Sequence, residues 1–250
     1  MAKVRSRPAQ QPAPPPLSDA VTGRSILKVL ALWAGLSLVA GLATAWSTRA
    51  LEVRDPQLQT LLIVVEVYAL LPIAMLIVYG GWRRLAQVVR FRWTSWRDLG
   101  LSVGMYLATL ATVCVAYVLL GFLLGPAGDS VRTLFRDATF ISRIPGASVL
   151  DLALIGLQTV FLAALAEELL FRGLLFSWLR ARFSAATTVL VVAAIFGLQH
   201  FIGPAVAVAG FVWGVGAGLL REKTGSTLNT VIMHMLGDCT LLAGAYVLFR

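Results

Sequence analysis

Long runs of apolar residues separated by short polar segments form the main pattern of the chain. A helix needs about 20 apolar residues to cross a hydrocarbon core of about 30 Å. Runs of roughly this length predict seven membrane-spanning helices, at residues 25–47, 59–80, 99–124, 149–180, 185–202, 205–220 and 227–249. Residues 126–147 place apolar side chains at helical spacing among charged ones, which favours a short amphipathic helix at the membrane interface. The pattern therefore predicts an all-α fold, a polytopic membrane helical bundle of about seven to eight transmembrane helices.

Composition divides the chain into three segments. Residues 1–22 are basic and rich in proline, which predicts a disordered tail. Residues 23–148 hold the first three predicted spans and the amphipathic connector. Residues 149–250 hold the last four spans and most of the charged groups that lie within apolar runs. We expect these four helices to form the core that carries the chemistry.

The distribution of charge indicates the partners and the orientation. A chain that is 58% hydrophobic and 13% charged is typical of membrane proteins. Its net charge is +9, and the Lys and Arg residues lie mostly between the predicted spans, without a basic stripe interleaved with aromatic residues. We therefore expect the partner to be a lipid bilayer and not a nucleic acid. The N-terminal segment and loops 80–98, 180–184 and 221–226 hold fourteen Lys and Arg, and the alternate segments hold six. This predicts a multi-pass plasma-membrane protein with a cytoplasmic N-terminus and, after seven spans, an external C-terminus. A re-entrant element at 126–147 would reverse the side of the C-terminus.

Small residues within the spans suggest packing contacts. Gly210, Gly214 and Gly218 recur every four residues, which predicts a helix face that packs closely against a neighbour; a dimer seam is the alternative. Cys114 and Cys239 lie in different predicted spans with no paired spacing, and we expect both to be small buried hydrophobic residues.

Two adjacent carboxylates and a guanidinium lie within the fourth predicted span. Each charge at the centre of a membrane helix costs about 2.5–3.5 kcal/mol, so such residues rarely lack a role. Glu168 and Arg172 are four residues apart and share a helix face, which predicts an ion pair, whereas Glu167 points in another direction. One carboxylate is then structural and the other is available for chemistry. The alternative is that all three residues form one network that braces the bundle.

The two histidines of the chain also lie in apolar runs. Glu167 lies 16 residues before residue 183 and His200 lies 17 after it, so a chain reversal near 183 puts both at the same depth in antiparallel helices. His234 and Asp238 form another pair at i and i+4, at about mid-membrane. A water between Glu167 and His200 could be deprotonated there, and His234 with Asp238 could hold the oxyanion. No Ser or Cys stands in a nucleophile motif, which favours direct attack by water.

Three motifs in this order, Glu-Glu-xxx-Arg (residues 167–172), Phe-xxx-His (196–200) and His-xxx-Asp (234–238), resemble the CPBP family. This is the family of type II CAAX prenyl endopeptidases and bacteriocin-processing or immunity proteins, and the resemblance covers about residues 149–249. It implies an intramembrane endopeptidase whose catalytic four-helix core is residues 149–250. The roles that it implies are water activation by Glu167 with His200, oxyanion stabilisation by His234 and Asp238, and support by Glu168, Arg172 and Phe196. The family has Asn or Asp at the last position, so Asp238 is either protonated or orients His234.

Cofactor and substrate follow less directly from the residues. Members of the family have been discussed both as metalloproteases and as metal-independent glutamate proteases. Glu167, His200 and His234 could ligate zinc, but the chain lacks a His-Glu-x-x-His motif, so we predict no cofactor. We expect a peptide or membrane-protein substrate, and the oligomeric state stays open.

Two other functions are compatible with the same residues. A proton-coupled transporter would use Glu66, Glu167 and His200 as a relay. A non-proteolytic immunity factor of the same family would bind peptides without cleaving them.

Overall fold

The computed structural model describes residues 21–50, 56–124, 149–200 and 204–249. The predicted tail up to residue 20 and the predicted amphipathic helix at 126–147 lie outside these ranges. Within them the regular structure is helical throughout, which confirms the predicted all-α class. The helices are α1 (Gly23–Ala50), α2 (Pro56–Tyr79), α3 (Trp82–Val88), α4 (Trp96–Leu124), α6 (Val149–Gly156), η4 (Leu157–Ala163), α7 (Ala164–Glu168), η5 (Leu169–Leu175), α8 (Phe176–Arg180), α9 (Ala185–Gln199), α10 (Pro204–Thr224) and α11 (Thr227–Phe249).

Each predicted span coincides with one of these helices or with the continuous run from α6 to α8. Among the described residues, four helical stretches are long and apolar enough to cross a membrane, namely Gly23–Ala50, Trp96–Leu119, Val149–Arg180 and Thr227–Val247. A fifth results if Glu66–Tyr79 and Trp82–Val88, which are bent by 96° relative to each other, form one broken span. The structure therefore has a helical membrane bundle, but the predicted number of seven to eight spans is not confirmed. One reason is that α9 has only 15 residues, which is short for a full crossing.

The outer surface of the bundle is apolar, as a lipid-facing surface must be. Leu38, Leu42, Trp46 and Val118 are all more than half exposed. Cys114 and Cys239 are also exposed, so the prediction that they are buried was wrong. The physical reason is that lipid tails are as apolar as a protein core, so a small apolar side chain needs no burial in a membrane helix.

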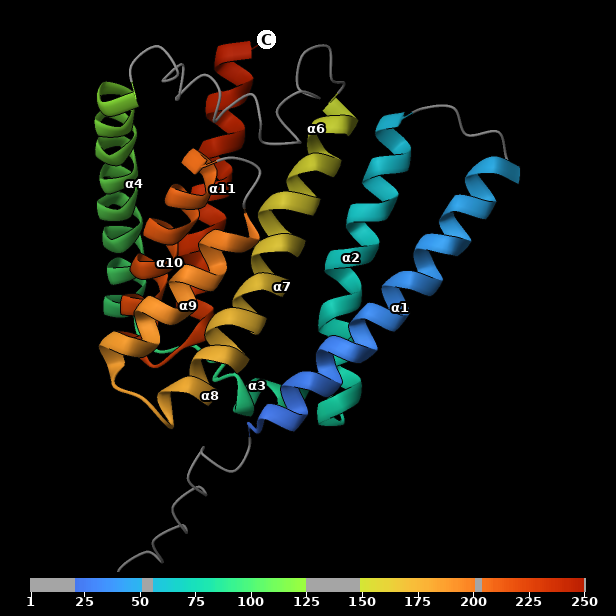
Figure 1. Ribbon diagram of the computed structural model, residues 1–250, viewed down its shortest axis with the longest axis horizontal. Helices are drawn as coiled ribbons and strands as arrows, with labels where there is room; N and C mark the ends of the chain where they lie inside the picture. Colours follow the sequence, from blue (N-terminus) through green and yellow to red (C-terminus); the bar gives the residue numbers. More distant parts are fainter. Residues whose placement is uncertain (1–20, 51–55, 125–148, 201–203, 250) are drawn as a thin grey trace, which may run out of the picture.

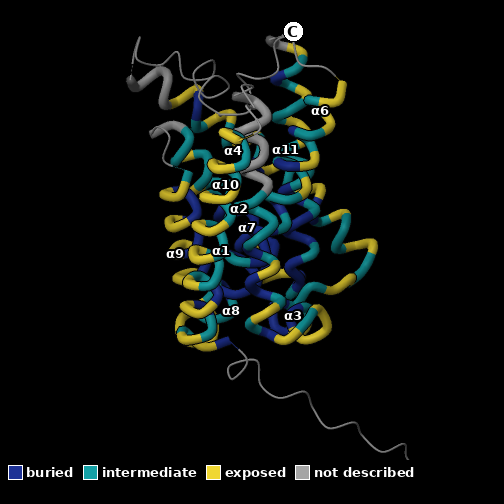
Figure 2. Tube along the Cα trace, turned by 90° about the vertical axis from the view of Figure 1, so that its right-hand side faces the viewer, coloured by how far each residue is buried: buried dark blue, intermediate teal, exposed yellow. Residues whose placement is uncertain are grey.

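The long helical run from α6 to α8 lies between two groups of helices (Figure 1). On one side of it are α1 and α2, and on the other are α4, α10 and α11, with α9 packed against α10. Figure 2 shows that the buried residues gather inside the bundle around α7 and toward the end where α3 and α8 lie. The core of the protein thus surrounds the segment that carries the two adjacent glutamates.

The segments rich in Lys and Arg gather at one end of the bundle (Figure 1). The amide of Thr227 donates to the carbonyl of Arg90 (3.1 Å), which joins the α10–α11 turn to the segment between α3 and α4. The guanidinium of Arg180, at the end of α8, pairs with Glu222 of α10 at 3.1 Å. The start of α1, with Arg24 and Lys28, lies at the same end. The described parts of the segments rich in Lys and Arg therefore lie together at one end of the bundle.

The glycines of α10 pack against α9 within the same chain, as predicted. A Cβ atom added at Gly214 would lie 2.7 Å from the Cα of Ala193, and one at Gly210 would lie 3.1 Å from the Cα of Gly197. A Cβ at Gly210 would also lie 3.5 Å from Nδ1 of His200. The close approach of the two backbones thus sets the position of the histidine at the end of α9.

Candidate active site

The two glutamates lie on a short α-helical segment between two π-helical segments. The segment α7 has five residues, and η4 and η5 on either side of it have seven residues each. Wide π turns inside α-helices often occur at functional sites, because they redirect side chains locally. Here Glu167 is 7% exposed and Glu168 is 0% exposed, so both carboxylates are turned into the bundle.

Glu168 and Arg172 form the predicted ion pair. Nη1 of Arg172 donates to Oε1 of Glu168 at 2.8 Å, and both side chains are fully buried. Nη2 of Arg172 donates to the carbonyl of Gly214 on α10 at 3.3 Å. The guanidinium carbon lies 4.3 Å from the centre of the Phe196 ring on α9. Arg172 therefore joins three helices around one buried charge pair.

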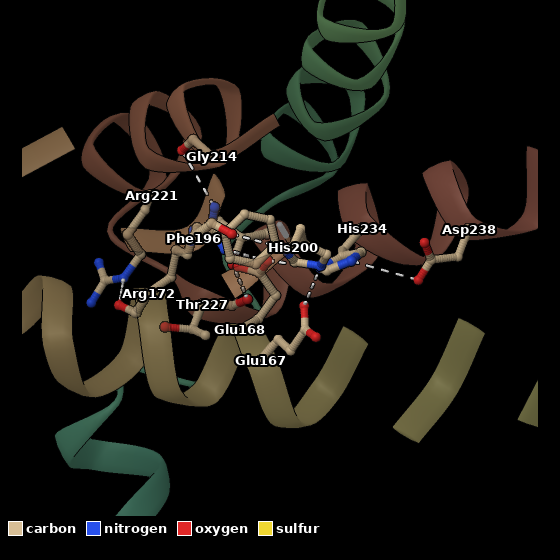
Figure 3. A network of polar contacts seen from close by, with 11 residues as sticks. Glu167, Glu168, Arg172, Phe196, His200, Gly214, Arg221, Thr227, His234 and Asp238 are labelled. Carbon is tan, nitrogen blue, oxygen red and sulfur yellow. Dashed lines mark hydrogen bonds and ion pairs between the residues drawn. The ribbon is translucent and has the colours of Figure 1, made fainter. Parts of the chain in front are cut away.

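Glu168 has a second partner that the sequence did not indicate. Nδ1 of His234, on α11, lies 2.9 Å from the same Oε1 atom of Glu168. On the other side of the ring, Nε2 of His234 lies 3.6 Å from Oδ2 of Asp238. His234 thus stands between two carboxylates, and the predicted pair with Asp238 is only one half of its surroundings (Figure 3). Spacing along α11 could reveal Asp238, but only the packing of α11 against α7 brings Glu168 to the ring.

Glu167 faces His200, as the depth comparison predicted. Oε2 of Glu167 lies 3.9 Å from Nε2 of His200, and the two side chains are 10% and 31% exposed. Nδ1 of His200 lies 2.7 Å from the carbonyl oxygen of Phe196. Because a carbonyl only accepts hydrogen bonds, Nδ1 is the protonated nitrogen, and a neutral ring then presents the lone pair of Nε2 to Glu167.

A residue from the N-terminal half completes the surroundings of Glu167. The hydroxyl of Tyr68 on α2 donates to Oε1 of Glu167 at 3.2 Å. Tyr68 lies in an apolar span and belongs to none of the three motifs, so no local signal in the sequence distinguishes it. Glu66, two residues earlier, instead accepts a hydrogen bond from Thr44 of α1.

Phe196 lies at the centre of the site. Its ring meets the Phe171 ring edge-on at 5.2 Å, and its centre is 4.6 Å from that of His200 and 6.0 Å from that of His234. Phe196 is 2% exposed, and its ring is an apolar contact shared by the buried guanidinium of Arg172 and the two histidine rings. The ring of Phe196 thus packs the Phe-xxx-His motif against Arg172 of the first motif and His234 of the third.

The donor geometry does not favour a metal ion. Among the residues that the structure describes, no three side chains of His, Cys, Asp or Glu are placed so that they could hold one. The set Glu167, His200 and His234 named from the sequence therefore does not fit a zinc site in this arrangement, and we derive no step through a metal.

The fold and the site together define a class of protein, a helical membrane protein with a carboxylate–histidine site buried in its bundle. Residues 149–240 match the family model described as type II CAAX prenyl endopeptidase Rce1-like. The match supports the resemblance to the CPBP and CAAX protease family, and the matched segment includes every motif residue named from the sequence. Helices α1 to α4, with Tyr68, lie outside the matched segment. No curated protein and no solved structure gave a significant match to the chain.

Proposed function

We propose that the protein is an intramembrane endopeptidase that cleaves a peptide bond by direct attack of water, with Glu167 and His200 as the activating pair. The observation that carries this proposal is the opposition of Oε2 of Glu167 and Nε2 of His200 at 3.9 Å. Both atoms accept hydrogen bonds when the ring is neutral and Nδ1 carries its proton. A water has two donors, and it can give one to each atom at about 2.8 Å. Its lone pairs then point away from both groups toward a substrate.

The chemical steps follow from this placement. The water oxygen bonds to the carbonyl carbon of the substrate, and a proton of the water passes to the carboxylate of Glu167. The carbonyl π electrons move to oxygen and form a tetrahedral oxyanion. The C–N bond then breaks, and the departing amine takes up the proton that Glu167 received. The products are a carboxylic acid and an amine, which exchange the remaining proton to give a carboxylate and an ammonium group, and the enzyme returns to its starting state.

His234 is the proposed donor to the oxyanion. Its Nδ1 is held by Glu168, which is itself held by Arg172, so the ring has a fixed orientation. Its Nε2 points toward Asp238 at 3.6 Å, which is longer than a hydrogen bond. We assign Asp238 to the orientation of His234 in its doubly protonated form, in which Nε2–H is free to donate to the oxyanion. Glu168, Arg172 and Phe196 then support the site without touching the substrate.

We propose a peptide or membrane-protein substrate that reaches the site from the lipid bilayer. The exposed apolar surface of the bundle and the burial of the site support this choice. We further propose a plasma-membrane location with the basic end of the bundle in the cytoplasm, because the start of α1 and loops 80–98, 180–184 and 221–226, which gather at that end, hold eleven Lys and Arg residues.

The contacts of Glu66 favour a protease over the proton relay. The relay needs Glu66, Glu167 and His200 to be in sequence, yet Glu66 bonds to Thr44 on α1. The side chain of α2 that reaches Glu167 is Tyr68, and residues two apart on a helix point in different directions. The geometry therefore supports hydrolysis at one site better than proton transfer along α2.

Mass spectrometry of membranes tests the proposal. Cells with the wild-type protein, the Glu167→Gln variant or no protein are compared for membrane peptides and membrane proteins. We expect one or more uncut precursors to accumulate both without the protein and with the variant. Purified wild-type protein in nanodiscs should then cut such a precursor, whereas the variant should not. Binding of the precursor by both proteins without any cleavage would favour the immunity factor instead.

A further inference from the structure

Tyr68 touches the candidate base but lies outside the segment that matches the protease family. Its hydroxyl donates to Oε1 of Glu167 at 3.2 Å, while Oε2 of the same carboxylate faces His200 at 3.9 Å. The two oxygens of Glu167 therefore have different neighbours, one from α2 and one from α9. The direction of the hydrogen bond is fixed, because an ionised carboxylate only accepts and a phenol can donate.

We propose that Tyr68 is a positioning residue for peptide hydrolysis, which holds Oε1 of Glu167 so that Oε2 is presented to His200 and to the attacking water. This inference rests on the proposed function. The last torsion of a glutamate is broad and roughly two-fold, so the carboxylate plane is not set by rotamer preference alone. The hydrogen bond from the Tyr68 hydroxyl to Oε1 sets that plane. It thereby reduces the number of unproductive carboxylate orientations that Glu167 can adopt.

The position of Tyr68 is itself fixed by packing around α2. Leu71, Ala74 and Met75, on the turns that follow Tyr68, are buried in one cluster with Ala166 and Leu169. Ala166 precedes Glu167 directly, so this cluster sets the distance between α2 and α7 at the site. The turns of α2 that follow Tyr68 are thus packed into the core of the bundle.

Helix α1 holds α2 immediately beside Tyr68. Nε1 of Trp33 donates to the carbonyl of Val67 at 2.9 Å, and the Thr44 hydroxyl donates to Glu66. Pro72 lies four residues after Tyr68 and has no N–H, so the carbonyl of Tyr68 lacks its usual helical donor. Contacts from α1 therefore stabilise the turn of α2 at Tyr68, which lacks one of its own backbone hydrogen bonds. It follows that the first two helices take part in the site in addition to anchoring the protein.

The test compares two tyrosines of the same helix. Tyr68→Phe removes the donor to Glu167, and Tyr79→Phe removes a hydroxyl that donates to Ser25 at 3.0 Å, away from the site. Both variants are purified in nanodiscs and assayed on the precursor identified by mass spectrometry. We expect Tyr68→Phe to lower kcat about tenfold, as for loss of a hydrogen bond to a charged group, with little change in KM. Tyr79→Phe should keep the wild-type kcat and KM. A fluorinated tyrosine at position 68, which keeps the donor, should restore kcat.

An infrared measurement separates this inference from the proposed function. The carboxylate stretch of Glu167 is obtained as the difference between each protein and the same protein with Glu167→Gln. We expect this band to shift in Tyr68→Phe and to stay in place in Tyr79→Phe, whether or not the protein cleaves a peptide. An unchanged band with unchanged kcat in Tyr68→Phe would overturn the inference, as would a rise in KM alone. Retained cleavage by Glu167→Gln would overturn the proposed function instead.

Discussion

Oε1 of Glu168 and Nδ1 of His234 lie 2.9 Å apart, although 66 residues separate them in the chain. The same oxygen accepts from Arg172 at 2.8 Å, so one buried atom joins the first motif to the third. This contact makes Glu168 more than a counter-ion for Arg172, because it also fixes the ring that we propose as the oxyanion donor. The two adjacent glutamates therefore have separate partners and should respond differently to the same substitution.

Exchange of each glutamate for glutamine should separate the two roles. Glu168→Gln leaves the fully buried Arg172 without its counter-charge, and removal of one partner of a buried pair costs about 3–5 kcal/mol. We expect a lower yield of folded protein and a lower unfolding temperature. Glu167→Gln should keep the wild-type yield and unfolding temperature and abolish cleavage. Fluorescence-detected size exclusion and thermal unfolding in detergent measure the first effect, and the precursor assay measures the second. A stable Glu168→Gln protein would show that the pair does not brace the bundle.

Replacement of Arg172 by lysine tests the geometry of the buried guanidinium. Lysine keeps the charge but lacks the planar group whose two nitrogens donate to Glu168 and to the Gly214 carbonyl. It also lacks the flat guanidinium that stacks on the Phe196 ring. We expect a loss of about 1.5–3 kcal/mol, the value of a hydrogen bond to a charged group. Arg180→Lys is the matched control, since its pair with Glu222 is exposed and should contribute little. Equal unfolding temperatures for the two variants would contradict this account.

The contact between α9 and α10 should be sensitive to a single methyl group. Gly214→Ala puts a Cβ 2.7 Å from the Cα of Ala193, and two backbones must separate to admit it. Overpacking of this kind costs about 1–3 kcal/mol, and here it should also displace His200 and reduce cleavage. Gly104→Ala in α4, where a Cβ meets nothing within 4 Å, should leave stability unchanged or raise it. Thermal unfolding and the precursor assay on both variants provide the comparison.

Metal chelation provides a test of the reaction type. No three described side chains of His, Cys, Asp or Glu are placed to hold a metal ion, and in the proposed mechanism Glu167 and His200 activate the water alone. We expect cleavage to be unchanged after treatment with a strong chelator and dialysis into metal-free buffer. A zinc protease treated in parallel should lose its activity. Loss of cleavage that added zinc restores would contradict the proposed mechanism.

The sequence by itself determined the class of fold and the charged members of the candidate site. Apolar runs of spanning length predict membrane helices, because a helix pairs all of its backbone N–H and C=O groups within one segment and lipid offers them no other partner. Charged residues within those runs are few, since each is costly, so Glu167, Glu168, Arg172, His200, His234 and Asp238 could be named without coordinates. Spacing along one helix was sufficient for the pair of Glu168 and Arg172, because residues four apart share a face.

Only the tertiary structure decided which residues meet across helices. The rotation of a helix about its own axis depends on its packing against neighbours, and periodicity does not specify it for a helix that is apolar on all sides. For this reason the contact of Tyr68 with Glu167 and that of His234 with Glu168 did not follow from the motifs. The same reason explains the error for Cys114 and Cys239, because burial in a membrane protein depends on which face meets lipid, and both kinds of face are apolar.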